Sequence, residues 1–399
     1  MGIIVAVVGL GFLILAHEFG HFIVAKATGM RVEEFSLGFG RYLISRRVGE
    51  TIYGISALPL GGYVRVTGMH REEFAARVAE AREEESQARA FDDVDGEDLS
   101  ATPGDLPKVR SPRDPEDRLA GKRALSAAEI VATPEGRRYY AHPFWHKLLF
   151  IVAGVTMNMV VAFLLIYIVG MSQGENIVST VIEAVEPDTP AAAAGVQVGD
   201  RIVSVAGSST GDWEEVRTQI LTHPGETVPV VVERDGDLVD LTAVIQEQED
   251  GTGFLGVQPG VEHRDLGPVS GFGYAARTTG SMVVLIFKGI GMMFSGDVPV
   301  TGSQGLAGPV GIIQLSTEAV QGGYYLMLLA LISVNLAILN MLPLLPLDGG
   351  HALFSIIERL RGRSISLRTF ERVSMVGLVL FVLLFIVATS NDFGRLFGG

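Results

Sequence analysis

The residues most able to do chemistry lie in one pentapeptide, His17-Glu18-Phe19-Gly20-His21. Histidines four positions apart lie on the same face of a helix, so both imidazoles can bind one zinc ion (Zn2+). The glutamate between them is placed to act on water at that ion. The motif occurs inside an apolar segment, where ionisable side chains are costly and mark function. It therefore predicts a catalytic zinc site with His17 and His21 as ligands and Glu18 as the catalytic carboxylate.

A catalytic zinc site usually has three protein ligands and one position for water. The best candidate for the third ligand is Asp348, in the apolar sequence NMLPLLPLDGGH at residues 340–351. A lone carboxylate is costly there unless it has a partner. Pro343 and Pro346 are expected to break the helix at this point. The alternative is that Asp348 only forms an Asp-Gly turn that terminates the helix.

Four apolar segments approach the length of about 20 residues that a helix needs to cross a bilayer. They are Gly2–Ala25, Leu148–Met171, Tyr324–Leu345 and Val373–Thr389. The first has no basic region before it and contains the histidine motif. We therefore interpret it as a retained helix and not as a signal peptide. Asp348 is expected at the end of the third span.

Lysine and arginine are distributed unevenly between the spans. Of the 31 in the chain, 19 lie in residues 26–147 and 6 in residues 172–323. Because positive residues mark the cytoplasmic side of a membrane, residues 26–147 and 346–372 are expected in the cytoplasm. Residues 172–323 and both termini are expected outside the plasma membrane. In this orientation the histidine motif and Asp348 reach a similar depth near the cytoplasmic face.

The net charge of the whole chain is 31 − 45 = −14, which argues against nucleic acid as a partner. The acidic excess lies in residues 172–323, and we interpret it as a solvated outer surface. The chain has no cysteine, which excludes thiolate ligands, a cysteine nucleophile and a disulfide framework.

The polar sequence between the first two spans is uneven. Residues 30–69 alternate in polarity and contain paired glycines, which predicts strands and β-hairpins. Residues 71–89 resemble a charged helix, and residues 92–138 resemble a flexible, acidic insertion. After the outer domain, residues 266–320 are amphipathic. Within them, Phe272–Phe294 is expected to be interfacial or buried against other helices, because it carries charges and glycines.

Residues 176–260 predict a small α/β domain. Strands are expected at 178–185, 201–205, 227–234 and 238–246, and short helices at 190–195 and 213–222. This order resembles a PDZ domain in its circularly permuted bacterial form, and another small α/β module is the alternative. The resemblance implies that a peptide-binding loop and groove strand come last, and their residues are Gly253, Phe254, Leu255, Gly256 and Val257.

The motifs together resemble the site-2 protease family of intramembrane zinc metalloproteases, in particular the bacterial, single-PDZ actinobacterial type. The resemblance rests on HEFGH in the first span, the Gly-Gly-Tyr-Val segment after it, the outer PDZ-like unit and the NxxPxxPLDGGH sequence. It implies cleavage within or near the transmembrane segment of a single-span protein. An anti-sigma factor that an upstream site-1-type protease has already trimmed is such a substrate.

The resemblance also implies substrate-binding residues. Asn335 and Asn340 match asparagines near the substrate, although asparagines in a membrane helix can also join helices. A further group would form an edge strand that holds the substrate extended, or else a plain hairpin: Gly61, Gly62, Tyr63, Val64 and Arg65. Asn158 matches a family asparagine, but the Gly-Pro that usually precedes it is Gly154-Val155 here, which leaves its role open. Four other histidines are not expected to be ligands: His70, His142, His146 and His351.

The predicted fold is thus a polytopic α-helical membrane protein with four transmembrane helices, an inserted α/β PDZ domain and a cytoplasmic β-hairpin region. Its parts are expected at residues 1–25, 26–147, 148–171, 176–260, 266–320, 324–348 and 373–389. Two alternative functions remain: a non-proteolytic PDZ scaffold, and a protease that clears signal-peptide remnants. A structural zinc site would usually have four protein ligands, and only three are visible, which favours an enzyme. A metal transporter is disfavoured because paired repeats are missing from the sequence.

Overall fold

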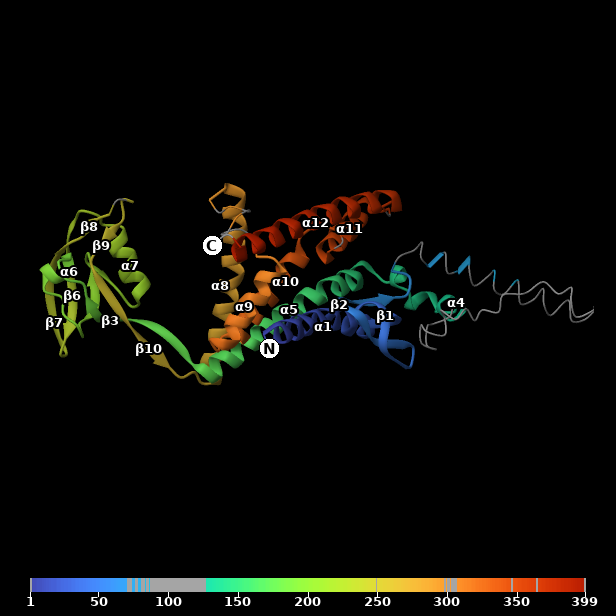
Figure 1. The fold of residues 1–399 in the computed structure, drawn as a ribbon, viewed down its shortest axis with the longest axis horizontal. Coiled ribbons are helices and arrows are strands. Elements are labelled where there is room, and N and C mark those ends of the chain that lie inside the picture. The colour runs from blue at the N-terminus through green and yellow to red at the C-terminus, as the bar shows by residue number, and fades with distance from the viewer. Residues whose placement is uncertain are drawn as a thin grey trace, which may run out of the picture. The chain divides into compact units, whose positions relative to one another are not determined.

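The structure is a computed structural model that describes residues 2–69, 74–75, 78–79, 83, 86, 127–248, 250–297, 299, 302, 307–345, 347–363 and 365–397. It contains two compact units (Figure 1). One consists of Met1–Ile166 with Ala275–Gly399, and the other is Tyr167–Tyr274. Most of the expected charged helix and acidic insertion lies outside the described residues, as do His70 and Pro346.

The first unit is mainly helical. Two of its helices, α5 and α8, continue into the second unit. The helices are α1 (Gly2–Ala27), α4 (Ala127–Val131), α5 (Phe144–Gln173), α8 (Pro268–Ser295), α9 (Pro309–Gln321), α10 (Tyr325–Met341), α11 (Asp348–Arg361) and α12 (Leu367–Phe397). Two single 3-10 turns, Glu135–Arg137 and Tyr139–Ala141, precede α5.

Three of these helices are long and apolar enough to cross a membrane: α1, α5 and residues Arg368–Arg395 of α12. They correspond to three of the four expected spans. The expected third span is interrupted, because α10 has 17 residues and ends at Met341. The expected interfacial segment Phe272–Phe294 falls within the helix α8.

The prediction that Asp348 lies at the end of the third span was wrong in detail. Asp348 is instead the first residue of the next helix, α11. Pro343 disfavours helical geometry at the residue before it, and Leu342 is accordingly extended, with φ −59° and ψ 140°. The chain then turns, and a new, amphipathic helix begins at Asp348. At about 1.5 Å per residue, α10 is about 25 Å long, slightly shorter than a typical hydrocarbon core of about 30 Å.

Between α1 and α4 the chain forms two long strands, β1 (Val32–Val48) and β2 (Thr51–Val66), which pair antiparallel. Both strands bend, so residues 34–37 of β1 pair with 62–65 of β2 and also with 52–55. Gly38 makes one bend possible, because it has φ +88° and a Cβ there would meet the carbonyl of Leu58. In this register residues 62–65 form one edge of the small sheet.

A cluster of buried apolar side chains joins the small sheet to the helices. Met30 and Val32 follow α1, Val66 ends β2, Phe150 belongs to α5, and Ala352 belongs to α11. Burial of each large side chain contributes about 1.5–3 kcal/mol. The elements that carry the predicted zinc ligands are therefore packed on a shared core.

The second unit contains a sheet in the order β10-β3-β4-β6-β7. Its elements are β3 (Glu175–Val185), α6 (Pro190–Ala194), β4 (Arg201–Val205), β5 (Ser208–Ser209), α7 (Trp213–Leu221), β6 (Thr227–Arg234), β7 (Asp237–Val244), β8 (Gln246–Glu247), β9 (Gly253–Phe254) and β10 (Val257–Arg264). Alternate residues of β6, Val228, Val230 and Val232, are buried in its core, as the period of a strand requires. The strands β4 and β6 span the residues expected for them.

An ion-pair cluster attaches the β1–β2 turn to the end of α1. Glu50 accepts hydrogen bonds from Lys26 at 2.9 Å and from Arg137 at 2.7 and 2.9 Å. The hydrogen bonds from Arg137 are the main reason that the pKa of Glu50 falls to about 2, from an ordinary value of 4.5. A lowered carboxylate pKa stabilises the folded arrangement above the ordinary pKa, and this stabilisation is lost as the pH falls toward about 2.

We therefore predict that acid loosens the β1–β2 sheet between about pH 4.5 and pH 2. At neutral pH, Glu50→Gln should speed amide exchange in β1 and β2 by about threefold, since a partly exposed ion pair contributes less than about 1 kcal/mol. Hydrogen–deuterium exchange of the full-length protein measures this. The control is Glu135→Gln, which neutralises an exposed carboxylate in the turn before Arg137. Equal exchange in both variants would contradict the prediction.

Candidate zinc site

Both histidines of the motif lie on the buried face of α1. The buried residues of this helix recur every three or four positions, at Ala6, Gly9, Leu13, His17, Gly20, His21 and Ala25. This spacing follows one face of a helix. His17 and His21 are 8% and 6% exposed. The two imidazoles therefore face the interior of the helical unit on successive turns.

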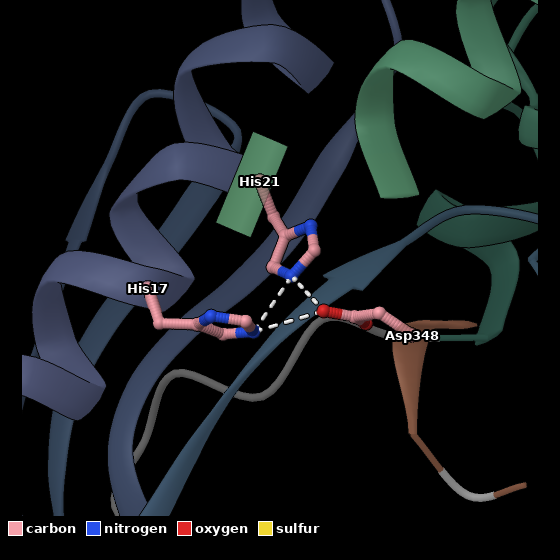
Figure 2. Close-up of side chains that lie close together, drawn as sticks. All are labelled: His17, His21 and Asp348. Atoms are coloured by element: carbon pink, nitrogen blue, oxygen red, sulfur yellow. Dashed lines mark hydrogen bonds and ion pairs between the residues drawn. The ribbon is translucent and has the colours of Figure 1, made fainter. Parts of the chain in front are cut away.

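Figure 2 shows Asp348 approaching the two imidazoles from a separate segment. Its Oδ2 lies 3.0 Å from His17 Nε2 and 3.2 Å from His21 Nε2. The two Nε2 atoms are 3.2 Å apart. Tetrahedral zinc with bonds of about 2.0–2.1 Å would separate its ligand atoms by about 3.3 Å. The three donors therefore have the spacing of a zinc site with a fourth position left for water.

The α5 helix supports this site from one side. Phe150 accepts a hydrogen bond at 2.7 Å at its backbone carbonyl from Nδ1 of His21, which directs Nε2 of that ring toward the other donors. One turn further on, a Cβ at Gly154 would collide with Nε2 of His21 and with the His17 ring. Gly20 of α1 packs in turn against the Ala153 carbonyl. These contacts leave space beside the ligand atoms that only a glycine preserves.

Glycines also set the position of Asp348. A Cβ at Gly349 would meet the carbonyls of Met341 and Leu342, and one at Gly350 would meet the backbone of Leu344. On the other side, Gly377 of α12 contacts the carbonyl of Leu345. Leu344 and Leu345 before α11 are therefore packed between the first turn of α11 and α12. This packing holds the carboxylate opposite α1.

Comparisons with known proteins show the family of the chain. A model described as Peptidase family M50 matches residues 5–384. The chain belongs to peptidase family M50. The zinc metalloprotease RasP of Oceanobacillus iheyensis is 32% identical over 97% of both chains. The regulator of sigma-E protease RseP of Escherichia coli is 32% identical over 98% of both. The regulator of sigma-W protease RasP of Bacillus subtilis is 27% identical over 99% of both.

Among solved structures, the chain is similar to the PDZ domain of the SdrC-like protein of Listeria monocytogenes. The two are 20% identical, with a TM-score of 0.19, and the match covers 20% of this chain and 86% of that chain.

Membership of family M50 and the names of the full-length relatives confirm the predicted enzyme class, a zinc metalloprotease. They also confirm zinc as the cofactor. Within the described residues, His17, His21 and Asp348 form the cluster of donors able to hold a metal ion. Their individual roles as ligands remain predictions, supported by the spacing of the three donor atoms.

Glu18 of this M50 peptidase lies between the donors and the small sheet. A Cβ at Gly62 of β2 would contact the Glu18 side chain, and the backbone amide of Val64 faces the carboxylate. Glu18 does not belong to the donor cluster. This arrangement fits a base beside the metal, and it brings the predicted edge strand next to the base.

The remaining residues that the sequence singled out lie outside the three-donor cluster. Asn335 is exposed on α10 and Asn340 is half-buried in its last turn, so their roles remain predictions. His142 and His146 face each other with Nδ1 atoms 3.4 Å apart, and His351 packs against Phe370.

The predicted groove segment lies in the second unit. Leu255 is buried in its core, and its carbonyl accepts a hydrogen bond from Ala191. The carbonyl of Gly256 accepts one from Glu186. The segment packs beside α6, and peptide binding by residues 253–257 remains a prediction.

Two residues at the site were not predicted from the sequence. Phe150 was missed, and the role of Asn158 was left open. Nothing in the local pattern shows that the Phe150 carbonyl reaches His21. Asn158 lies one turn after Gly154, and its Nδ2 is 3.5 Å from Nδ1 of His17. The spacing of Gly154 and Asn158 places both on one face of a helix, which is a signal that could have connected them.

We predict that Gly154→Ala lowers zinc affinity by at least about tenfold, since the added methyl occupies the space beside both imidazoles. Alanine favours a helix more than glycine does, so a loss of zinc would not come from a weaker α5. Metal analysis after dialysis against a chelator measures the effect. Gly11→Ala is the control, because a Cβ there meets open space. Full zinc retention by Gly154→Ala would contradict this account of the site.

Proposed function

We propose that this M50 peptidase is an intramembrane protease that hydrolyses a peptide bond within or near the transmembrane segment of a single-span membrane protein. The observation that carries the proposal is the three-donor site on α1 and α11, with a carboxylate beside it. Both histidines are buried, and α1, which carries them, and α5, which packs beside them, are both long and apolar enough to cross a membrane. A protease with ligands at this position acts on peptide bonds at membrane depth.

The arrangement in the membrane follows from the charges and the helix lengths. We propose that α10 is a short fourth span beside α1, α5 and α12. Lysine and arginine then place the β1–β2 sheet and the active site toward the cytoplasm, and the PDZ-like unit and both termini outside. The 17 residues of α10 are at the lower limit for a span, and its end at Met341 lets the α11 carboxylate reach the site from the cytoplasmic side.

The residues at the site suggest how hydrolysis proceeds. His17, His21 and Asp348 would hold zinc, which supplies a Lewis acid that acidifies water and polarises a peptide carbonyl. Glu18 takes the proton from the attacking water and returns it to the leaving amine. The peptide N–H and C=O groups of a helical substrate are already paired, so the substrate must unwind locally before it is cleaved.

The edge strand of the small sheet is the proposed docking place for the unwound substrate. Residues 62–65 pair with residues 34–37 on one side, and an extended peptide can add along the edge of a sheet. A cavity of about 510 Å³ runs beside this edge, lined by residues that include Phe39, Tyr63, Val64, Arg65, Met69 and Ile130. Gly62 allows close approach to Glu18, whereas a Cβ at Gly61 would meet the Phe39 ring. Asn335 and Asn340 would bind the substrate from α10.

We propose an anti-sigma factor as the substrate class. Two full-length relatives are named as regulators of sigma-E and sigma-W, which supports this choice. Such a substrate would be trimmed outside the membrane by an upstream site-1-type protease. The PDZ-like unit, through residues 253–257, would bind or exclude the trimmed end. Clearance of signal-peptide remnants would use the same chemistry and differs only in the substrate.

We predict that Glu18→Gln lowers cleavage of a model transmembrane substrate by about 10²- to 10⁴-fold while zinc content stays unchanged. Asp348→Asn should lose both zinc and activity, because an amide is a weaker ligand than a carboxylate. Purified full-length protein is assayed for cleavage and metal content side by side. Wild-type activity in Glu18→Gln would refute its role as the base. A wild type without zinc or cleavage would favour the scaffold alternative.

The edge strand can be tested by disulfide cross-linking, because the chain has no cysteine of its own. In a Glu18→Gln background, Arg65→Cys should cross-link to a substrate with one cysteine near the scissile bond. Arg46→Cys, exposed on β1, is the matched control. We expect at least about tenfold more adduct at position 65, because proximity raises effective concentration. Equal adduct at both positions would argue against docking along this edge.

A further inference from the structure

The two zinc-binding histidines differ in what supports their second ring nitrogen. Nδ1 of His21 lies 2.7 Å from the Phe150 carbonyl, which fixes the proton on Nδ1 and leaves Nε2 free for a metal. Nδ1 of His17 faces the side-chain amide of Asn158, with Nδ2 at 3.5 Å. His17 therefore needs a different acceptor if it is to present the same tautomer.

Asn158 has an unpaired acceptor at this place. The residue is 1% exposed, and its Oδ1 is buried without a hydrogen-bond partner. A buried amide oxygen without a partner is unfavourable, because it has lost its hydrogen bonds to water. With Nδ2 of Asn158 toward His17, the imidazole would accept a hydrogen bond at Nδ1 and carry its own proton on Nε2. That proton would point at Asp348 and block metal binding.

A half-turn of the Asn158 amide resolves the tautomer of His17 and gives Oδ1 a partner, and Nδ2 then takes the unpaired place. The two ends of the amide are nearly equal in size, so the turn exchanges Oδ1 and Nδ2 within the same space. Oδ1 then accepts a hydrogen bond from the protonated Nδ1 of His17, and Nε2 keeps its lone pair for zinc. We propose that Asn158 is a positioning residue that holds His17 in the zinc-binding tautomer, an inference that rests on the proposed ligand role of His17.

The backbone of Asn158 is held in place from a third helix. Ser333 of α10 is fully buried, and its hydroxyl donates to the Asn158 carbonyl at 2.8 Å. Gly154, one turn earlier on α5, leaves the space in which the His17 ring sits. Asn158 thus connects α10 and α5 to a ligand on α1. The supporting groups for His17 and His21 come from the same helix, α5, eight residues apart.

Zinc affinity of the full-length protein, measured by competition with a chelator, tests this role. Asn158→Leu removes the acceptor at similar size, and affinity should fall by about 10- to 100-fold. Asn158→Asp restores an acceptor, and affinity should return to within about threefold of wild type. Cobalt substituted for zinc should show an altered absorption spectrum in Asn158→Leu and a near-normal one in Asn158→Asp, which loss of packing alone would not produce.

The control is Tyr325→Phe, which removes a hydrogen bond from α10 to the Val5 carbonyl of α1 away from the site. Its zinc affinity should stay unchanged. Wild-type affinity in Asn158→Leu, or an equal loss in Asn158→Leu and Asn158→Asp, would overturn the proposal. A similar loss in Tyr325→Phe would also overturn it, because general helix packing would then explain the effect.

His17→Ala separates this inference from the proposed function. If His17→Ala loses zinc and Asn158→Leu does not, only the role of Asn158 fails. If His17→Ala keeps full zinc affinity, the ligand assignment fails and the role of Asn158 fails with it.

Discussion

The convergence of two imidazoles and one carboxylate on a single point is the interaction on which the rest of this structure depends. Their donor atoms lie 3.0–3.2 Å apart, and the two histidines are buried while Asp348 is half-buried. Ionisable groups are stable there only when each has a partner or a metal. The helices must therefore approach closely at this point, and glycines at positions 20, 154 and 377 permit contacts that any Cβ would prevent.

The same requirement explains the irregular path of the chain near Asp348. A straight helix through residues 325–348 would carry the carboxylate about 10 Å further along its own axis. Pro343 ends α10 instead, and the Gly349-Gly350 pair lets a second helix start in contact with the loop. The carboxylate thereby reaches α1 from the first turn of α11.

The β1–β2 sheet brings a second constraint to the same place. Its edge at residues 62–65 lies against Glu18, so the predicted base and the proposed substrate strand are neighbours. A peptide held along this edge would be extended, and its amide bonds would be accessible to attack. The hydrophobic cluster around Met30, Val66 and Phe150 fixes the sheet on α1 and α5. The proposed peptide-binding edge and the predicted catalytic residues therefore share one rigid support.

The sequence by itself determined the chemistry, because HExxH, an aspartate among prolines and three long apolar runs are local patterns. It also determined most elements of the second unit, where buried valines alternate along strands. Only the tertiary structure decided that Asp348 begins a helix, that β1 and β2 bend into one sheet, and that Phe150 and Asn158 reach the histidines. Those contacts join residues 129 and 141 positions apart. They depend on how helices pack against each other, which no local period encodes.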